Sequence, residues 1–160
     1  MEFDEINNFI SKNLPSIDAC KIKIEKKNDT SLIVTAPLEY NKNDKGIAFG
    51  GSIYNIALMA CWSTMFIECK KKLDNPNILT RDGQIRYRHP CSDENIQAIC
   101  NIPTKRQWEG FFAHYEKTGK TSLSLSSKII SNNDIAVFFD GVFVLLDEWK
   151  VHILIILICY

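Results

Sequence analysis

One long uncharged segment constrains the fold of this chain more than any other feature. From Gly46 to Ile67 the sequence has 22 consecutive residues without a charged side chain, and three lysines follow at 70–72. A helix of this length could span a bilayer. However, the segment begins with glycines and a serine and carries polar side chains such as Asn55, and a helix buried on most sides of a folded core is equally apolar. We therefore predict a buried core helix over residues 50–73, and we keep a small membrane protein as the last alternative.

The segments on either side of this helix alternate polar and apolar residues, which is typical of half-buried antiparallel strands. The strands are predicted at residues 19–27, 30–38, 78–88, 95–102, 120–131 and 134–146. Shorter helices are predicted over residues 2–13 and 104–119, the second closed by Gly119. An antiparallel sheet with one apolar face needs a covering element, and the segment 50–73 is the one long enough to supply it. The predicted fold class is α+β, with an antiparallel sheet wrapped around one long apolar central helix, which is the hotdog architecture.

Length and composition place further limits on the chain. Its 160 residues are sufficient for one domain, which we assign to residues 1–150. The apolar stretch 151–160 is a C-terminal extension of uncertain status: it is too short to span a membrane as a helix, and it could pair in a sheet or arise from a shifted reading frame. Because 19 basic and 19 acidic residues give a formal net charge of zero, we predict no nucleic-acid partner.

The six cysteines occur without any CxxC pair, and the histidine spacing does not suit a zinc site. We therefore expect no bound metal and free, mostly buried thiols in a reducing compartment. The first ten residues are acidic and lack the apolar core of a secretory signal. The expected location is the cytoplasm.

Two motifs carry a resemblance to a known family. The segment from Ala36 to Trp62, APLEYNKNDKGIAFGGSIYNIALMACW, and the later IRYRHP at 85–90 resemble the YiiD C-terminal family, the putative thioesterases of the hotdog superfamily. The resemblance is specific from Ala36 to Pro90 and looser as far as Leu146. It implies a protein that binds an acyl thioester of coenzyme A or of an acyl carrier and hydrolyses it, with no cofactor besides coenzyme A in the substrate. It also implies a homodimer or a dimer of dimers, because hotdog sites generally form between two subunits.

Wider hotdog thioesterases have the pattern Asn-x-x-Gly-x-x-His-Gly-Gly at this position. Here Asn43, Gly46 and the glycine pair match, whereas Phe49 stands in place of the histidine. Many of these enzymes also have a catalytic acid further along the helix, where this chain has Leu58. The resemblance therefore leaves the general base open.

Backbone chemistry can supply one half of thioester hydrolysis. The first N–H groups of a helix lack intrahelical partners and lie at the positive end of its dipole, and Gly50 and Gly51 have no side chain to block a thioester carbonyl. We predict that these two glycines polarise the carbonyl. We predict that Asn43 orients the attacking water and that Asp44, the nearest carboxylate, is the candidate base.

The remaining candidates are assigned to substrate binding. The apolar lining of the acyl site is predicted from Phe49, Ile53, Ala57 and Trp62. Ser52 is interpreted as the N-cap of the helix and as a substrate contact. Cations at the strand end before Pro90 would suit the phosphates of coenzyme A. These cations are Arg86, Arg88 and His89.

Other readings stay open. Cys61 has no base next to it in sequence and is predicted to pack in the core. A non-catalytic acyl-thioester binding module is the main alternative to an enzyme, because the turn lacks a histidine and the helix lacks an acid. A hotdog dehydratase is a weaker alternative, since it requires the missing histidine. A Walker A loop and a dinucleotide-binding loop are excluded by the spacing around Gly51.

Overall fold

The computed structural model describes residues 3–147, so the predicted extension at 151–160 lies outside the described residues. Within this range the strands form one antiparallel sheet with the order β1-β2-β4-β5-β6-β3. The strands are β1 (Lys23–Lys27), β2 (Ser31–Pro37), β3 (Asn77–Tyr87), β4 (Asn95–Asn101), β5 (Lys120–Ser131) and β6 (Asp134–Leu146). The helices are α1 (Phe3–Asn13), α2 (Pro15–Ala19), α3 (Gly50–Lys70) and α4 (Lys105–Thr118), with a 3-10 turn at Leu38–Tyr40.

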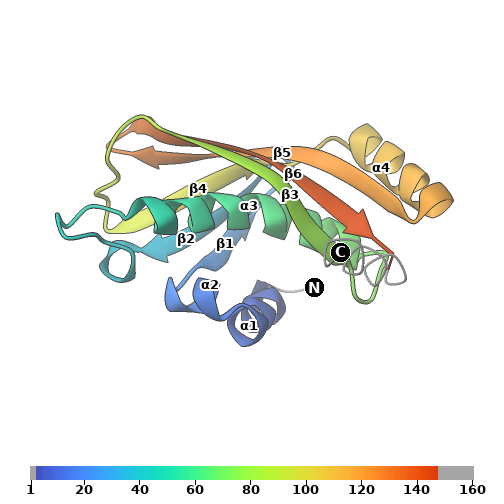
Figure 1. Cartoon of the computed structure of the whole chain (residues 1–160), viewed down its shortest axis with the longest axis horizontal. Coiled ribbons are helices and arrows are strands. Elements are labelled where there is room, and N and C mark those ends of the chain that lie inside the picture. Colours follow the sequence, from blue (N-terminus) through green and yellow to red (C-terminus); the bar gives the residue numbers. More distant parts are fainter. Residues whose placement is uncertain (1–2, 148–160) are drawn as a thin grey trace, which may run out of the picture.

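Helix α3 lies along one face of this sheet, which confirms the predicted hotdog architecture (Figure 1). The inward-facing residues of β2 and β6, among them Val34, Phe139 and Phe143, are fully buried. The hydroxyl of Ser127 in β5 donates a hydrogen bond of 2.7 Å to the carbonyl of Ala57 in the middle of the helix. Apolar packing and this buried polar contact together hold α3 at a fixed position on the sheet.

The long apolar segment is therefore a core helix. It ends at Lys70, three residues earlier than predicted, because the N–H groups of Lys72 and Leu73 both turn back to the carbonyl of Cys69. Among residues 3–147, no helix is long and apolar enough to cross a membrane.

The smaller helices cover the remaining surfaces. Helix α1 lies on the side of α3 away from β5 and β6 (Figure 1), where Phe9 stacks on Phe66 at 5.0 Å between ring centroids. Helix α2 was not predicted; it begins at Pro15, whose ring suits the first turn of a helix. Helix α4 packs on β5 and ends at Gly119 in the left-handed conformation, as predicted.

Candidate functional site

The loop before α3 is a small closed structure. Lys42 and Ala48 form an isolated β-bridge, and the N–H of Asn43 donates to the carbonyl of Ile47 at 2.8 Å. Gly46 has a φ of +76°, which glycine adopts without strain. At the end of the loop, the N–H of Phe49 donates to the carbonyl of Asn41 at 2.7 Å. These backbone contacts fix the direction in which the chain enters α3.

The side chains predicted to handle water are engaged within the loop. Oδ1 of Asn43 accepts hydrogen bonds from the N–H groups of Lys45 at 2.9 Å and Ile47 at 3.3 Å. Asp44 has a side chain that is 79% exposed, and it pairs with the ammonium group of Lys45 at 3.0 Å. Asn43 therefore shapes the turn, and Asp44 faces solvent. The catalytic roles predicted for these two residues stay predictions.

The first turn of α3 has no side-chain cap. Its N-cap residue is Phe49, with extended backbone angles (φ −69°, ψ 136°), and the first intrahelical bond runs from the N–H of Ile53 to the carbonyl of Phe49. The interpretation of Ser52 as the N-cap is therefore wrong, because Ser52 is the third residue of the helix. Among the described residues, the N–H groups of Gly50, Gly51 and Ser52 have no acceptor. Three backbone donors at the positive end of a helix dipole form a position suited to an oxyanion.

Two aromatic side chains border these donors. The ring of Phe49 lies against Gly51, since a Cβ built on Gly51 would lie 2.7 Å from Cε1 of the ring. The hydroxyl of Tyr87, at the end of β3, donates to the carbonyl of Gly50 at 2.8 Å. Both aromatic residues remain about half exposed, at 56% for Phe49 and 52% for Tyr87. The donors therefore lie on an accessible surface with apolar walls.

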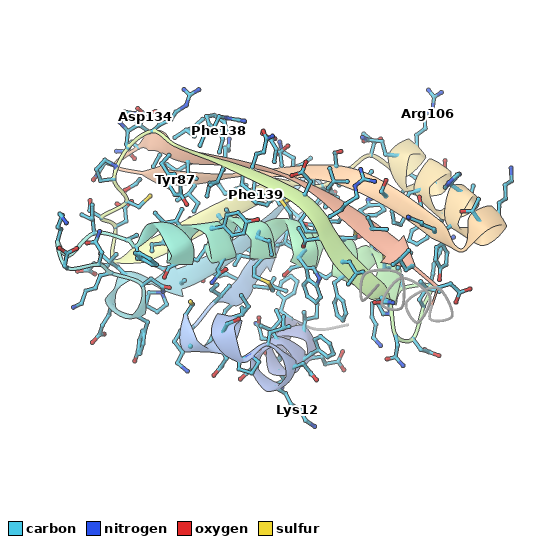
Figure 2. The ribbon with its side chains drawn as sticks, viewed as in Figure 1. Lys12, Tyr87, Arg106, Asp134, Phe138 and Phe139 are labelled. Atoms are coloured by element: carbon cyan, nitrogen blue, oxygen red, sulfur yellow. The ribbon has the colours of Figure 1, made fainter. Side chains whose placement is uncertain are left out.

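Tyr87 lies on the same side of the sheet as α3 (Figure 2). Burial and the neighbouring Tyr54 raise the pKa of Tyr87, so its hydroxyl stays protonated and able to donate at neutral pH. The hydroxyl of Tyr54 in turn reaches the backbone of β3 at Gly83, where a Cβ would clash with it. Sequence reasoning missed both tyrosines. The alternation of β3 could have found Tyr87, because it shares a face with the apolar Ile85.

The predicted cations do not converge on the helix terminus within this chain. Arg86 pairs in register with Phe138 of β6. Because neighbouring residues of a strand point to opposite faces, Arg86 lies on the other face of the sheet from Tyr87, and Figure 2 shows Phe138 on that face. There it forms an ion pair with Asp140. A hydrogen bond of 2.6 Å from the Ser126 hydroxyl, and then the contact with Arg86, lower the pKa of the Asp140 carboxyl. This arrangement stabilises the sheet surface and leaves phosphate binding by Arg86 a prediction.

The other two cations at this strand end also have partners. The guanidinium of Arg88 lies over the ring of Phe138 at 4.8 Å from its centroid. Nε2 of His89 lies 3.4 Å from a carboxylate oxygen of Asp134. Phosphate binding by these residues likewise stays a prediction.

The accessible face of α3 differs from the predicted acyl lining. Ile53 is 3% exposed and Ala57 is fully buried, because both side chains are part of the core between α3 and the sheet. That they line the acyl site stays a prediction. The incompletely buried face is a stripe that starts at the helix N-terminus. It consists of Gly51, Asn55, Leu58 and Trp62, which are spaced as one side of an α-helix.

Cys61 is fully buried, which confirms its predicted place in the core. Burial raises the pKa of its thiol well above the usual value, so this group is a poor nucleophile. The five cysteines in the described part of the chain are all free, and no cluster of potential metal ligands occurs in that part.

A cavity of about 600 Å³ lies elsewhere, between α4 and the start of β5. Its lining includes Gly110, Phe111, His114 and Lys120 and none of the residues around the N-terminus of α3. It is therefore separate from the candidate site.

Comparisons with known proteins identify solved structures with the same fold. A solved structure of a protein of unknown function from Chlorobaculum tepidum TLS is 33% identical, with a TM-score of 0.86, over 91% of this chain and 94% of that one. A structure described as a putative thioesterase from Shewanella oneidensis is 21% identical, with a TM-score of 0.80, over 91% and 97% of the two chains. A thioesterase from Haemophilus influenzae is 11% identical, with a TM-score of 0.68, over 92% of each chain. The latter two show a shared fold.

The family comparison covers all of the described residues. The model of the family described as "Putative thioesterase (yiiD_Cterm)" matches residues 3–147, which include the glycine turn, all of α3 and every strand of the sheet. The chain belongs to this YiiD C-terminal thioesterase family of hotdog-fold proteins.

Proposed function

We propose that this protein hydrolyses an acyl thioester of coenzyme A or of an acyl carrier. The observation that carries the proposal is the uncapped first turn of α3, where the N–H groups of Gly50, Gly51 and Ser52 have no acceptor among the described residues. Membership of a thioesterase family supports the same reaction class.

The chemistry follows from these donors. A thioester carbonyl placed at the helix terminus receives hydrogen bonds from the N–H groups of Gly50 and Gly51, which stabilise the negative charge that develops on its oxygen. Water adds to the carbonyl carbon, the C–S bond breaks, and a carboxylic acid and a thiol are formed. Loss of one such donor costs about 3–4 kcal/mol of transition-state stabilisation in comparable enzymes.

The acyl group extends along the accessible stripe of α3. Phe49 forms an apolar wall beside Gly51, and Leu58 and Trp62 continue the apolar surface one and two turns beyond Asn55. Apolar contacts of this kind favour a hydrocarbon acyl group over a charged one.

The active form is a homodimer. Among the described strands, β3 is hydrogen-bonded only to β6, which leaves its other edge open along Asn77–Tyr87. An open edge of this length pairs readily with another strand. A second chain that pairs at this edge would cover Tyr87 of β3 and the accessible stripe of α3.

A non-catalytic binding module is the second candidate. One observation favours it: α3 has no carboxylate between Gly50 and Glu68, and Glu68 pairs with Lys27 and Lys71 at the far end of the helix. Such a module would bind acyl thioesters at the same amides without turning them over.

A pair of substitutions at Gly50 tests the role of the amides. Phe49 has the extended backbone that precedes proline readily, and proline is favoured at the first helical position, so Gly50→Pro removes one N–H with little effect on the helix. Gly50→Ala is the matched control, since its Cβ would lie an ordinary 3.6 Å from the Tyr87 hydroxyl oxygen and the N–H is kept.

The assay follows thiol release from acyl-CoAs of increasing chain length, with binding of a non-hydrolysable thioether analogue measured in parallel. We expect Gly50→Pro to lower kcat by about 10²–10³-fold and Gly50→Ala to change it by less than about threefold, roughly 0.7 kcal/mol. Equal kcat values for the two variants would contradict the role of the Gly50 amide. Analogue binding without turnover of any acyl-CoA would establish the binding module instead.

A further inference from the structure

Hydrolysis at the α3 terminus also needs a group that holds the attacking water. The residues predicted for this task are occupied in the loop: Asn43 accepts two backbone N–H groups, and Asp44 is an exposed partner of Lys45. The water must therefore be held by another polar side chain near the N–H groups of Gly50, Gly51 and Ser52, one that has no hydrogen-bond partner within the chain.

Asn55 has the required position. It follows Gly51 by four residues and Ser52 by three, so it lies on the same face of α3, one turn along. Side chains of an α-helix lean toward its N-terminus and cover the preceding turn. The Asn55 side chain is therefore expected to lean toward the turn that contains Gly51, beside the ring of Phe49 that packs on this glycine.

The burial and bonding of Asn55 distinguish it from its neighbours. It is half-buried, and its carboxamide has no hydrogen-bond partner among residues 3–147. The nearby phenol of Tyr87 already donates to the carbonyl of Gly50, and the hydroxyl of Tyr54 is directed to the backbone at Gly83. Ser52 is the other free polar side chain in the first turn, but its short hydroxyl stays close to the helix backbone.

We propose that Asn55 positions the attacking water, an inference that rests on the proposed thioesterase function. Its Oδ1 accepts a hydrogen bond from the water, which directs a lone pair of the water oxygen toward the carbonyl carbon. A C–O bond forms, the C–S bond breaks, and the electron pair of that bond leaves on the thiolate. The proton lost by the water passes through solvent to the thiolate, because a carboxamide does not accept a proton at neutral pH.

This assignment explains how the reaction proceeds without an acid on the helix. A carboxamide orients water but does not titrate, so kcat of the wild-type protein is expected to stay flat across the range in which carboxylates ionise. An aspartate at the same position would hold the water and would also act as a base once ionised.

The test compares Asn55→Ala, Asn55→Asp and the control Asn8→Ala, which replaces an exposed asparagine on α1, using the best acyl-CoA of the wild-type protein. We expect Asn55→Ala to lower kcat by about a hundredfold, as the loss of a positioning group does, with KM changed less than twofold. We expect Asn55→Asp to retain activity and to show a kcat that rises with pH through the pKa of the new carboxylate. The Asn8→Ala control should match the wild type.

The possible failures are distinguishable. A wild-type protein that hydrolyses acyl-CoAs together with an equally active Asn55→Ala variant would overturn the role of Asn55 and leave the proposed function standing. An increase in KM at constant kcat would also overturn it, since that result assigns Asn55 to substrate binding. A wild-type protein without thioesterase activity would overturn both proposals. Should Asn55→Ala fold poorly by circular dichroism, a flat pH profile in Asn55→Asp contradicts the inference.

Discussion

Two asparagines in the loop before α3 illustrate how much the role of a residue depends on distant partners. Asn43 fits the family pattern, but its side chain makes bonds to the backbone of its own turn. Asn41 is 1% exposed, and its amide donates to the carbonyls of Cys20 and Pro37 at 2.8 Å each. Its own carbonyl also accepts the N–H of Phe49. Asn41 therefore ties the loop to two other segments and holds the residue that caps α3.

Replacing Asn41 with alanine should destabilise the protein. The change leaves two carbonyls without their donor in a buried place, which we expect to lower the free energy of unfolding by about 1–3 kcal/mol. Urea denaturation followed by circular dichroism measures this change. The matched control is Asn43→Ala, whose lost bonds are largely exposed, so that water replaces them at a cost of about 0.5 kcal/mol. Equal losses in the two variants would show that the buried contacts of Asn41 add no more stability than the exposed contacts of Asn43.

The turn around Asn43 depends on residues close to it in sequence and could be predicted from the sequence. The burial of Asn41 could not be predicted in this way. The partners of Asn41 include Cys20, which is 21 positions away, and their approach depends on how β1 and the loop pack. The helix start was also predicted from a local pattern. Ser52 was assigned as the N-cap because serine is a common N-cap residue, but the backbone is extended at Phe49, which is the N-cap in the structure.

At the scale of secondary-structure elements, glycines have opposite effects on α4 and β3. Gly110 lies in the middle of α4, and a Cβ added there would meet no atom within 4 Å. Gly83 lies in β3, opposite Gly141 of β6, and a Cβ there would clash with the Tyr54 hydroxyl. Gly110 therefore lowers the stability of α4, whereas Gly83 leaves the room that Tyr54 of α3 needs to pack against the sheet.

Two alanine substitutions should therefore change stability in opposite directions. Gly110→Ala should raise the free energy of unfolding by about 0.5–1 kcal/mol, because alanine has the higher helix propensity. Gly83→Ala should lower it by about 1–3 kcal/mol, because Tyr54 must leave a well-packed position against Phe139. Thermal denaturation of both variants measures the difference. A stabilising Gly83→Ala would indicate that Tyr54 has room to move and that its contact with β3 is not needed.

The periodicity of the sequence was sufficient to predict the bounds of most strands and helices. It failed where the bounds of an element, or the partners of a side chain, depend on packing. The strands β5 and β6 coincide with their predicted ranges, since each has a long alternating pattern and Asn132-Asn133 marks the turn. β1 begins only at Lys23, because Lys21 adopts a positive φ of 53° and interrupts the extended chain. The cluster of Arg86, Arg88 and His89 was grouped by its closeness in sequence. However, Arg86 and Arg88 lie on the face of the sheet opposite to Tyr87, and each of the three residues has a partner on the sheet surface.

At the scale of the whole molecule, the open edge of β3 is the feature that a second chain would use. The N–H of Arg88 donates to the carbonyl of Ala136 at 2.8 Å, toward β6. Because successive N–H groups of a strand point to opposite sides, those of Ile85 and Tyr87 point toward the open edge. This edge lies beside the α3 terminus, as the contact between Tyr87 and Gly50 shows. A dimer formed there would join two such sites.

Two substitutions of Ile85 separate backbone pairing from side-chain packing. Both Ile85→Pro and Ile85→Ala lose the packing of a half-buried side chain, but only proline also removes the N–H that points to the open edge. We expect the wild type and Ile85→Ala to sediment with twice the 18.3 kDa mass of the chain and Ile85→Pro to sediment as a monomer. Analytical ultracentrifugation over a range of concentrations measures these masses.

The outcome also bears on the site, because in the proposed dimer the partner chain would cover the accessible stripe of α3. If the site is shared, Ile85→Pro loses thioesterase activity in proportion to the fraction of monomer, and activity returns at concentrations where the dimer re-forms. Full activity in a monomeric Ile85→Pro protein would show that one chain holds the complete site. Dimers of equal stability in all three proteins would place the interface on another surface, since pairing at β3 requires the N–H groups of its open edge.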